Sequence, residues 1–168
     1  MVDNPTATGC LEPARQLGRL AAAGGLKVTT AESCTGGGVA AAITAVSGSS
    51  GWFETGFVTY ANQSKQRVLG VAANTLADHG AVSGEVVREM VAGACRASGA
   101  DVGVAVSGIA GPGGGTDEKP VGTVWFGYGS ATRQQALCCH FEGDREAVRN
   151  QAVAQALECL VTALGQQG

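Results

Sequence analysis

The sequence predicts an α/β protein, a three-layer α/β/α sandwich around a mixed β-sheet, with residues 1–168 forming a single domain. Helical and strand patterns alternate early in the chain and two strand patterns follow one another late in it, which is the order of a mixed sheet. The 168 residues have the length of one domain, and no repeat, linker or low-complexity tract divides them. Hydrophobic residues make up 45% of the chain and charged residues only 15%, so a large buried core is expected.

The first part of the chain predicts helix, strand, helix and strand in that order. Apolar residues at helical spacing predict a helix over residues 10–23, ended by the pair Gly24-Gly25. Residues 26–30 are predicted to be a strand that runs into a polar, glycine-rich turn. An amphipathic helix over residues 39–46 follows this turn, and aromatic and β-branched residues predict a strand over residues 52–60.

Three helices are expected next. Asn62 is a candidate N-cap of a short helix ended by Gly70, and Asn74 is a candidate cap of a second short helix. Ser83 is a candidate cap of a longer amphipathic helix that ends at Gly99. Helices interleaved with strands in this way are typical of a sheet that is covered by helices.

The rest of the chain predicts three strands and a last helix. Residues 102–106 have no charged face, as expected of a strand that is covered on both sides. A loop over residues 108–120 separates this strand from strands predicted over residues 121–128 and 134–141. The last helix is predicted to start at Asp144 and to bury an apolar stripe.

Aromatic residues are scarce and clustered. Seven of the eight fall in two windows, residues 52–60 and 125–128. Because aromatic rings bury large areas in protein cores, we expect these two windows to be central strands that pack near one another.

Charge and hydropathy exclude several classes of partner. The formal net charge of −3 leaves no basic surface for a run of phosphates, so no nucleic-acid partner is expected. No segment approaches the roughly 18 apolar residues of a membrane span. The first residues also lack the pattern of a signal peptide, so we expect a cytoplasmic protein with no membrane contact. The scarcity of charge favours a homo-oligomer, a dimer or a larger symmetric assembly.

The six cysteines are interpreted mostly as small, reduced core residues, because no secretion signal accompanies them. Residues 138–140, Cys-Cys-His, suggest a metal site at first sight. Adjacent residues of a strand point to opposite faces, however, and no C-x-x-C spacing occurs in the chain. We therefore expect neither a metal nor a cofactor.

Polar residues collect at three places where apolar strands are predicted to end, which is where open α/β sheets bind ligands. These places are residues 32–37, 60–65 and 107–120. The third contains Gly111, Gly113 and Gly114, whose backbone N–H groups can approach a ligand closely, as in phosphate-binding nests. It matches neither a Walker A loop nor a dinucleotide-binding G-x-G-x-x-G motif, and a flexible surface loop is the alternative.

Ser33 is the candidate nucleophile. It lies between an expected strand end and a helix N-terminus, where backbone N–H groups around residues 35–37 would stabilise an oxyanion. Capping of the following helix by Ser33 or Thr35 is the alternative. Cys34 is a rival nucleophile whose side chain would be aimed elsewhere, and the two histidines are poorly placed for a Ser-His-Asp triad.

Lys65 is the candidate base for Ser33. It lies in the first turn of an expected helix, where the helix dipole and partial burial would lower the pKa of its amine towards the range of a proton acceptor. Tyr60, five residues earlier, would relay the proton or orient the hydroxyl. A surface lysine beside a half-buried tyrosine is the alternative. Arg145 and Arg149 start the last helix and would reach an anionic group or form a solvated face.

Five motifs in this order resemble the CinA carboxy-terminal domain family, and the resemblance covers about residues 11–164. The motifs are residues 29–37 (TTAESCTGG), residues 52–62 (WFETGFVTYAN) with Lys65, residues 80–83 (GAVS), residues 107–114 (SGIAGPGG) and residues 119–124 (KPVGTV). The chain is similar to the stand-alone form of the family, in which the larger amino-terminal domain is missing.

The resemblance implies hydrolysis of the carboxamide of nicotinamide mononucleotide to nicotinate mononucleotide and ammonia, as part of pyridine-nucleotide recycling and without a metal. It implies that Ser33 is the nucleophile and that Tyr60 and Lys65 activate it. A non-catalytic nucleotide- or partner-binding module of the same fold is the alternative, and an amidase for a smaller or unphosphorylated amide is a third reading. The expected substrate-binding residues are Glu32, Thr35, Gly36, Gly37, Ser107, Gly108, Gly111, Gly113, Gly114 and Arg145.

Overall fold

The computed structural model describes residues 5–167, and the side chains of residues 9–167. Residues 1–4 and 168, which belong to the expected domain, lie outside the described residues. Within the described part, five strands form one mixed sheet in the order β2-β1-β3-β4-β5. The strands are β1 (Val28–Glu32), β2 (Phe53–Val58), β3 (Val102–Gly108), β4 (Thr123–Gly129) and β5 (Gln134–His140). β1 pairs in parallel with β2 and β3, and β4 pairs antiparallel with β3 and β5.

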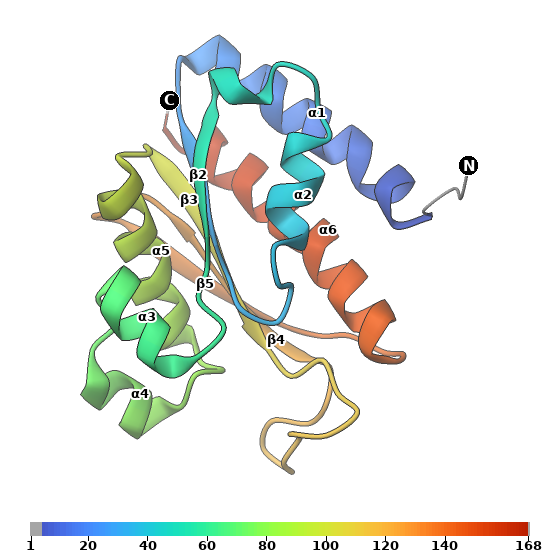
Figure 1. Ribbon diagram of the computed structural model, residues 1–168, viewed down its shortest axis with the longest axis vertical. Helices are drawn as coiled ribbons and strands as arrows, with labels where there is room; N and C mark the ends of the chain where they lie inside the picture. Colours follow the sequence, from blue (N-terminus) through green and yellow to red (C-terminus); the bar gives the residue numbers. More distant parts are fainter. Residues whose placement is uncertain (1–4, 168) are drawn as a thin grey trace.

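Helices cover both faces of this sheet, as Figure 1 shows. On one face lie α1 (Pro5–Gly24), α2 (Gly38–Thr44) and α6 (Arg145–Gly165). On the other lie α3 (Asn62–Leu69), α4 (Ala73–His79) and α5 (Gly84–Ser98). A short 3-10 turn, η1 (Ser49–Gly51), precedes β2. The predicted three-layer α/β/α sandwich around a mixed sheet is confirmed.

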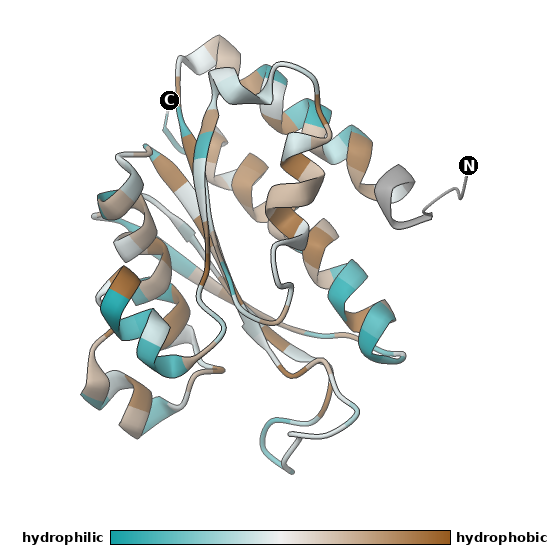
Figure 2. Ribbon diagram, in the orientation of Figure 1, coloured by the Kyte–Doolittle hydropathy of each residue, from teal (hydrophilic) through white to brown (hydrophobic). Residues whose placement is uncertain are grey.

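The alternation of side chains along the strands divides the core into two halves. Val104 and Phe126 face α1, α2 and α6, whereas Ala31 and Ala105 face α5, and all four are fully buried. β3 is buried along almost its whole length, which confirms the prediction for a strand without a charged face. Figure 2 shows that most of α6 is apolar while its first turns are hydrophilic. The core therefore anchors the body of α6 and leaves its polar start free for other contacts.

The expected caps of the two short helices are wrong. Asn62 and Asn74 lie inside α3 and α4, and the N-cap positions are Ala61 and Ala72, which have no side-chain cap. For α4, the carboxylate of Glu89 on α5 accepts a hydrogen bond from the Ala72 N–H at 2.7 Å. A residue from a distant helix thus satisfies the free amide, so local capping patterns did not reveal the helix start.

The expected cap of α5 is confirmed, and the predicted start of α6 at Asp144 coincides with its N-cap. The Val86 N–H donates to the Ser83 hydroxyl at 3.3 Å, and the Ala147 N–H donates to the Asp144 carboxylate at 2.9 Å. Both cap residues satisfy amides that have no partner within their own helix, which is the physical basis of the pattern. Asp144 therefore fixes where α6 begins.

The expected position of the aromatic strands is wrong. β2, which carries the first aromatic window, is an edge strand, and β1 and β3 separate it from β4. The side chains of Phe53 and Phe57 are only partly buried. The position of a strand in a sheet is set by its pairing with the other strands, and aromatic content alone does not report it.

Candidate active site

The carboxyl ends of the parallel strands bring the predicted polar segments together at one edge of the sheet (Figure 1). Ser33 follows β1 directly, and Tyr60 lies two residues after the end of β2. The Ser33 N–H donates to the Val106 carbonyl on β3, and the Thr59 N–H donates to the Glu32 carbonyl, both at 2.9 Å. These bonds place the Ser33 turn and the Tyr60 segment against one another.

Lys65 lies beside Ser33. Its Nζ is 3.1 Å from the Ser33 Oγ, and it also contacts the carbonyl oxygens of Thr59 at 2.8 Å and Tyr60 at 3.3 Å. Only 1% of the Lys65 surface is exposed, so this is a buried amine and not a surface lysine. The alternative interpretation of Lys65 as a surface residue is therefore wrong.

The charge state of Lys65 follows from this burial. Removal from water disfavours the ammonium ion and lowers the pKa of the Lys65 amine below its usual range. Among the described residues, no carboxylate forms a salt bridge with it to offset the effect. Its neighbours are carbonyl and hydroxyl oxygens, which carry no formal charge.

Cys34, the rival nucleophile, is part of the apolar core beneath α2 and α6. Burial raises the pKa of its thiol to about 11. A thiol with such a pKa stays protonated near neutral pH, and the thiolate is the nucleophilic form. The geometry therefore favours Ser33 over its neighbour.

Glu32 was expected to bind the substrate, but the structure places its carboxylate beneath the start of α2. Its carboxylate accepts hydrogen bonds from the N–H groups of Gly37 (3.2 Å), Val39 (2.8 Å) and Ala40 (3.0 Å) at the start of α2. The residue has no exposed surface. A carboxylate here satisfies helix amides and interacts favourably with the helix dipole. Glu32 thus supports the turn from beneath, and no part of it is left for the predicted contact with a substrate.

The backbone amides of the turn also differ from expectation. The Gly36 N–H donates to the Ser33 carbonyl at 3.0 Å, and the Gly37 N–H is taken by Glu32. Both glycines have positive φ, of 59° and 99°, which explains the residue type at these positions. Within the described residues, the N–H groups of Cys34 and Thr35 have no acceptor. The amides available to an oxyanion are therefore those of residues 34 and 35.

Arg145 links the Tyr60 segment to the glycine-rich loop. Its Nη2 donates to the Tyr60 hydroxyl at 3.1 Å, and its Nη1 donates to the Gly111 carbonyl at 2.9 Å. The Tyr60 side chain is 60% exposed. It is the Tyr60 carbonyl, and not the hydroxyl, that contacts Lys65.

Arg149, one turn further along α6, contacts the turn that carries Ser33. Its Nε donates to the Cys34 carbonyl and its Nη2 donates to the Thr35 carbonyl, each at 3.1 Å. Both arginines therefore bind backbone carbonyls of the site. Arg149 is partly buried there, whereas Arg145 stays exposed to solvent. The spacing of Arg145 and Arg149 was the signal in the sequence, but it did not show which groups they reach.

Two of the expected ligand contacts are used by the fold. The Ser107 hydroxyl donates to the Ala81 carbonyl at 2.8 Å and is almost fully buried, so it holds residues 80–83 beside the strand end. A Cβ at Gly108 would lie 2.6 Å from the Val124 side chain, so the absence of a side chain permits close strand packing. Neither the Ser107 hydroxyl nor the Cβ position of Gly108 is therefore open to a ligand.

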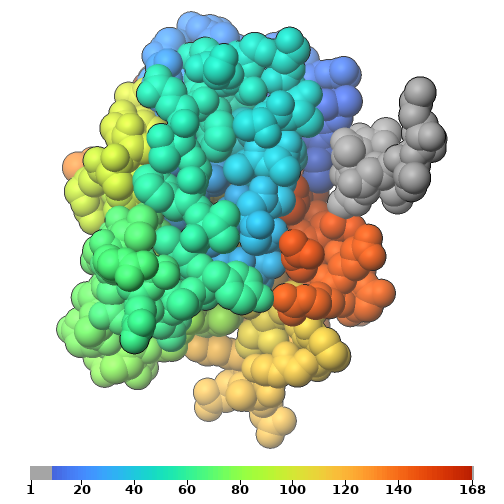
Figure 3. Space-filling view, viewed as in Figure 1, coloured from blue at the N-terminus to red at the C-terminus, as the bar shows by residue number. Residues whose placement is uncertain are grey.

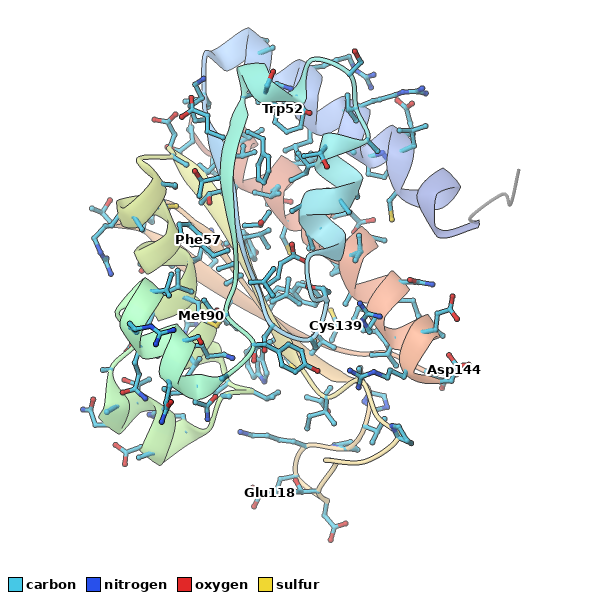
Figure 4. The ribbon with its side chains drawn as sticks, in the orientation of Figure 1. Trp52, Phe57, Met90, Glu118, Cys139 and Asp144 are labelled. Atoms are coloured by element: carbon cyan, nitrogen blue, oxygen red, sulfur yellow. The ribbon has the colours of Figure 1, made fainter. Side chains whose placement is uncertain are left out.

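The glycine-rich loop projects from this edge of the sheet, as the space-filling view in Figure 3 shows. Gly113 and Gly114 are exposed, and nothing lies within 4 Å of a Cβ built on Gly113. The Lys119 Nζ donates to the His79 carbonyl at 2.8 Å and ties the far side of the loop to the end of α4. Figure 4 places Glu118 at the tip of the loop, pointing away from the sheet.

Metal-binding clusters and membrane-spanning helices are both absent from the described part of the chain. No group of three or more His, Cys, Asp or Glu side chains in this part of the chain is arranged to hold a metal ion. None of the helices within residues 5–167 combines the length and the apolar character that crossing a membrane requires.

The fold and the family define the class of protein. The structure is an α/β/α sandwich with polar side chains gathered at the carboxyl ends of its parallel strands, where open α/β sheets bind ligands. The family model of the CinA C-terminal domain matches residues 11–164, and the chain belongs to this family.

Relatives of the chain are similar over most of their length. A protein of Escherichia coli strain K12, named nicotinamide-nucleotide amidohydrolase PncC, is 54% identical over 155 residues, which are 89% of this chain and 92% of the relative. A protein of Pseudomonas putida with the same name is 58% identical over 135 residues, 80% and 84% of the two chains. The crystal structure of competence damage-inducible protein A from Klebsiella pneumoniae has a TM-score of 0.90 and 42% identity, covering 98% of this chain and all of that one.

Proposed function

We propose that this chain is an amidohydrolase that converts nicotinamide mononucleotide to nicotinate mononucleotide and ammonia, in pyridine-nucleotide recycling in the cytoplasm. The observation that carries the proposal is the 3.1 Å contact between the Ser33 Oγ and the Lys65 Nζ. The substrate comes from the relatives, since proteins 54% and 58% identical to this one are named nicotinamide-nucleotide amidohydrolases. Identity at this level over most of both chains supports a shared reaction.

The surroundings of Lys65 favour it as the direct proton acceptor. A neutral amine has two N–H donors and one lone pair. The carbonyls of Thr59 and Tyr60 can only accept hydrogen bonds, so they take the two donors. The lone pair is then left for the hydroxyl proton of Ser33, and the lowered pKa of the amine keeps this neutral form accessible.

The reaction proceeds in two halves. The Ser33 Oγ forms a bond to the carboxamide carbon while its proton moves to Lys65, and the N–H groups of Cys34 and Thr35 stabilise the oxyanion. The carbon–nitrogen bond then breaks as the Lys65 ammonium returns the proton to the leaving nitrogen, so ammonia departs and an ester of Ser33 remains. A water molecule then attacks the ester carbon while Lys65 takes its proton. The bond from this carbon to the Ser33 Oγ breaks as Lys65 returns the proton to the Oγ, and the acid product loses its own proton to solvent as the carboxylate.

The remaining groups bind and orient the substrate. Tyr60 holds Lys65 through its carbonyl, and its hydroxyl is held by Arg145 at 3.1 Å. The exposed loop glycines Gly113 and Gly114, with Arg145, supply backbone and guanidinium N–H groups for the ribose and the phosphate. Binding of these distant parts of the substrate places the carboxamide against Ser33.

The test is ammonia release from nicotinamide mononucleotide by the purified protein. We expect release that matches the formation of nicotinate mononucleotide, and its loss in Ser33→Ala. Calorimetry should show that this variant still binds the nucleotide, and its thermal unfolding should match that of the wild type. No release by the intact protein, or an undiminished rate in Ser33→Ala, would overturn the proposal.

A control variant supports the assignment of the nucleophile, and two further measurements separate the competing functions. Cys34→Ala is the matched control next to the nucleophile, and we expect it to keep most of the activity because its thiol is buried and protonated. Binding of the nucleotide by the wild type without turnover would indicate a non-catalytic binding module. An unchanged kcat/KM for the riboside that lacks the phosphate would indicate an amidase for unphosphorylated amides.

A further inference from the structure

Arg149 contacts the Ser33 turn through the backbone alone. The Cys34 and Thr35 carbonyls accept from its Nε and Nη2, and the side chain is half-buried. Among the described residues no carboxylate forms a salt bridge with it. The guanidinium fork thus holds two consecutive carbonyl groups immediately after the nucleophile, with its positive charge unpaired.

The contact of Arg149 with the Cys34 carbonyl also sets the direction of a backbone amide. In a trans peptide, a carbonyl and the following N–H point in opposite directions. The one cis peptide bond within the described residues is Gly111-Pro112, so the bond between Cys34 and Thr35 is trans. Because Arg149 holds the Cys34 carbonyl, it also fixes the direction of the Thr35 N–H, which points away from the guanidinium.

That amide is free to bind another group. The Thr35 N–H has no acceptor within the described part of the chain, and the Thr35 hydroxyl is also buried without a partner. The bond from the Gly36 N–H to the Ser33 carbonyl orients the Cys34 N–H in the same way. Two amides next to the nucleophile are therefore fixed in direction and have no acceptor among the described residues, which is the arrangement that stabilises an oxyanion.

We propose that Arg149 is a positioning residue that holds the Thr35 amide as an oxyanion donor for the reaction at Ser33. The inference rests on the proposed amidohydrolase function. The guanidinium charge also polarises the Cys34–Thr35 peptide, since a carbonyl that accepts from a cation makes its own N–H a stronger donor. Arg149 thereby acts on the reaction without touching the reacting atoms.

Contacts other than those of Arg149 anchor α6 and the turn. The neighbouring residues Val148, Ala152 and Leu157 anchor α6 in the core and are fully buried. Glu32 and the Val106 carbonyl hold the turn from the sheet side. Removal of the guanidinium should therefore leave the overall structure in place and alter the orientation of one segment of the turn.

The kinetic test compares Arg149→Met and Arg149→Lys with the wild type. In Arg149→Met we expect kcat to fall about 100-fold, the effect of losing one oxyanion donor, while KM changes less than about threefold. Arg149→Lys should recover part of the loss, since an ammonium can bond one of the two carbonyls. The pH midpoint of kcat should stay where it is, because the contacts of Lys65 are unchanged. The same fold-change is expected for the riboside without a phosphate.

A second measurement is independent of catalysis. The NMR resonance of the Thr35 amide, recorded without substrate, should shift and exchange with solvent faster in Arg149→Met. Arg145→Met is the matched control for this resonance, since Arg145 contacts Gly111 and Tyr60 and not the turn. Its Thr35 amide should match that of the wild type.

Three results would overturn the inference: an unchanged Thr35 amide in Arg149→Met, a loss confined to KM of the phosphorylated substrate, or a loss explained by unfolding alone in both variants. The last is read from circular dichroism and thermal unfolding. The two proposals can fail separately. If the wild type has no amidase activity but the Thr35 amide still shifts in Arg149→Met, the proposed function is rejected while the placement of the amide by Arg149 is supported.

Discussion

The Ser33 turn and the glycine-rich loop both lie at the carboxyl ends of the parallel strands, but they are held in different ways. The turn is fixed from below by Glu32, from β3 by the Val106 carbonyl and from α6 by Arg149. The loop is attached mainly through its ends, by Arg145 at Gly111 and by Lys119 at the end of α4. A covalent step requires atoms placed within a fraction of an ångström, whereas binding tolerates adjustment, so the rigid region suits chemistry and the loosely held one suits recognition.

The largest effect should come from the buried amine of the rigid region. Lys65→Met should lower the rate of ammonia release by about 10²–10⁴-fold, because it removes the general base and keeps a side chain of similar length. The measurement is steady-state kinetics with nicotinamide mononucleotide. Lys27→Met is the matched control, since Lys27 pairs with Glu54 on the surface, and it should change the rate less than about twofold. Equal rates in the two variants would show that Lys65 is not the general base.

Glu32→Gln tests how the turn is held. The amide retains one acceptor oxygen and directs an NH₂ group towards helix N–H groups, so we expect a loss of about 3 kcal/mol in the free energy of unfolding. Denaturant unfolding measures the loss, and the rate of ammonia release should fall with it. Glu54→Gln, on an exposed carboxylate, should cost less than about 1 kcal/mol. A raised KM with unchanged stability would instead restore Glu32 as a substrate contact.

The pH dependence tests the charge state of Lys65. The neutral amine is the active form, so kcat/KM should rise with pH and level off above the pKa of Lys65, which burial places below 10.5. Well below that pKa, each pH unit should cost about tenfold in kcat/KM. Rates measured across the pH range, with Ser33 intact, give the midpoint. A flat profile would show that the proton acceptor is another group.

Stability should change with pH in the same direction. Because the pKa of Lys65 is lower in the folded than in the unfolded protein, the unfolded chain binds more protons between the two pKa values. The free energy of unfolding of the wild type should therefore rise with pH through this window, relative to Lys65→Met. Unfolding of both proteins at several pH values up to about 10 measures the difference. A difference that grows in favour of Lys65→Met would contradict the assignment.

The smallest effect should come from the loop. Gly114 has a φ of 89°, which is unfavourable for alanine, whereas Gly113 has an ordinary φ and open space around it. Gly114→Ala should therefore raise KM a few-fold with kcat nearly unchanged, and the Gly113→Ala control should do so less. Kinetics with the mononucleotide distinguish them. A fall in kcat in Gly114→Ala would show that the loop takes part in the chemistry.

Local patterns were sufficient for much of the fold. Helical and strand periodicity predicted the helices and strands and their order. Ser83 was identified as a cap and Asp144 as a helix start, and both accept hydrogen bonds from residues three positions along the chain. The predictions for Asn62, Asn74 and the aromatic strands failed. For α4 and β2 a distant segment decides the outcome: Glu89 takes the amide of Ala72, and strand pairing puts β2 at the edge of the sheet. At α3 the N-cap position lies one residue before Asn62, without a side-chain cap.

The site shows the same division. The sequence by itself determined the residue types, the motifs and the convergence of the strand ends, because the carboxyl ends of parallel strands share one edge of a sheet. Only the tertiary structure decided that Lys65 is buried against Ser33, that Glu32 supports a helix, and that Arg149 orients the turn. The Lys65–Ser33 and Arg149–Cys34 contacts join residues 32 and 115 positions apart, and spacing along the sequence does not encode them. The Glu32 contact is local, but its direction depends on how the turn folds back over the carboxylate.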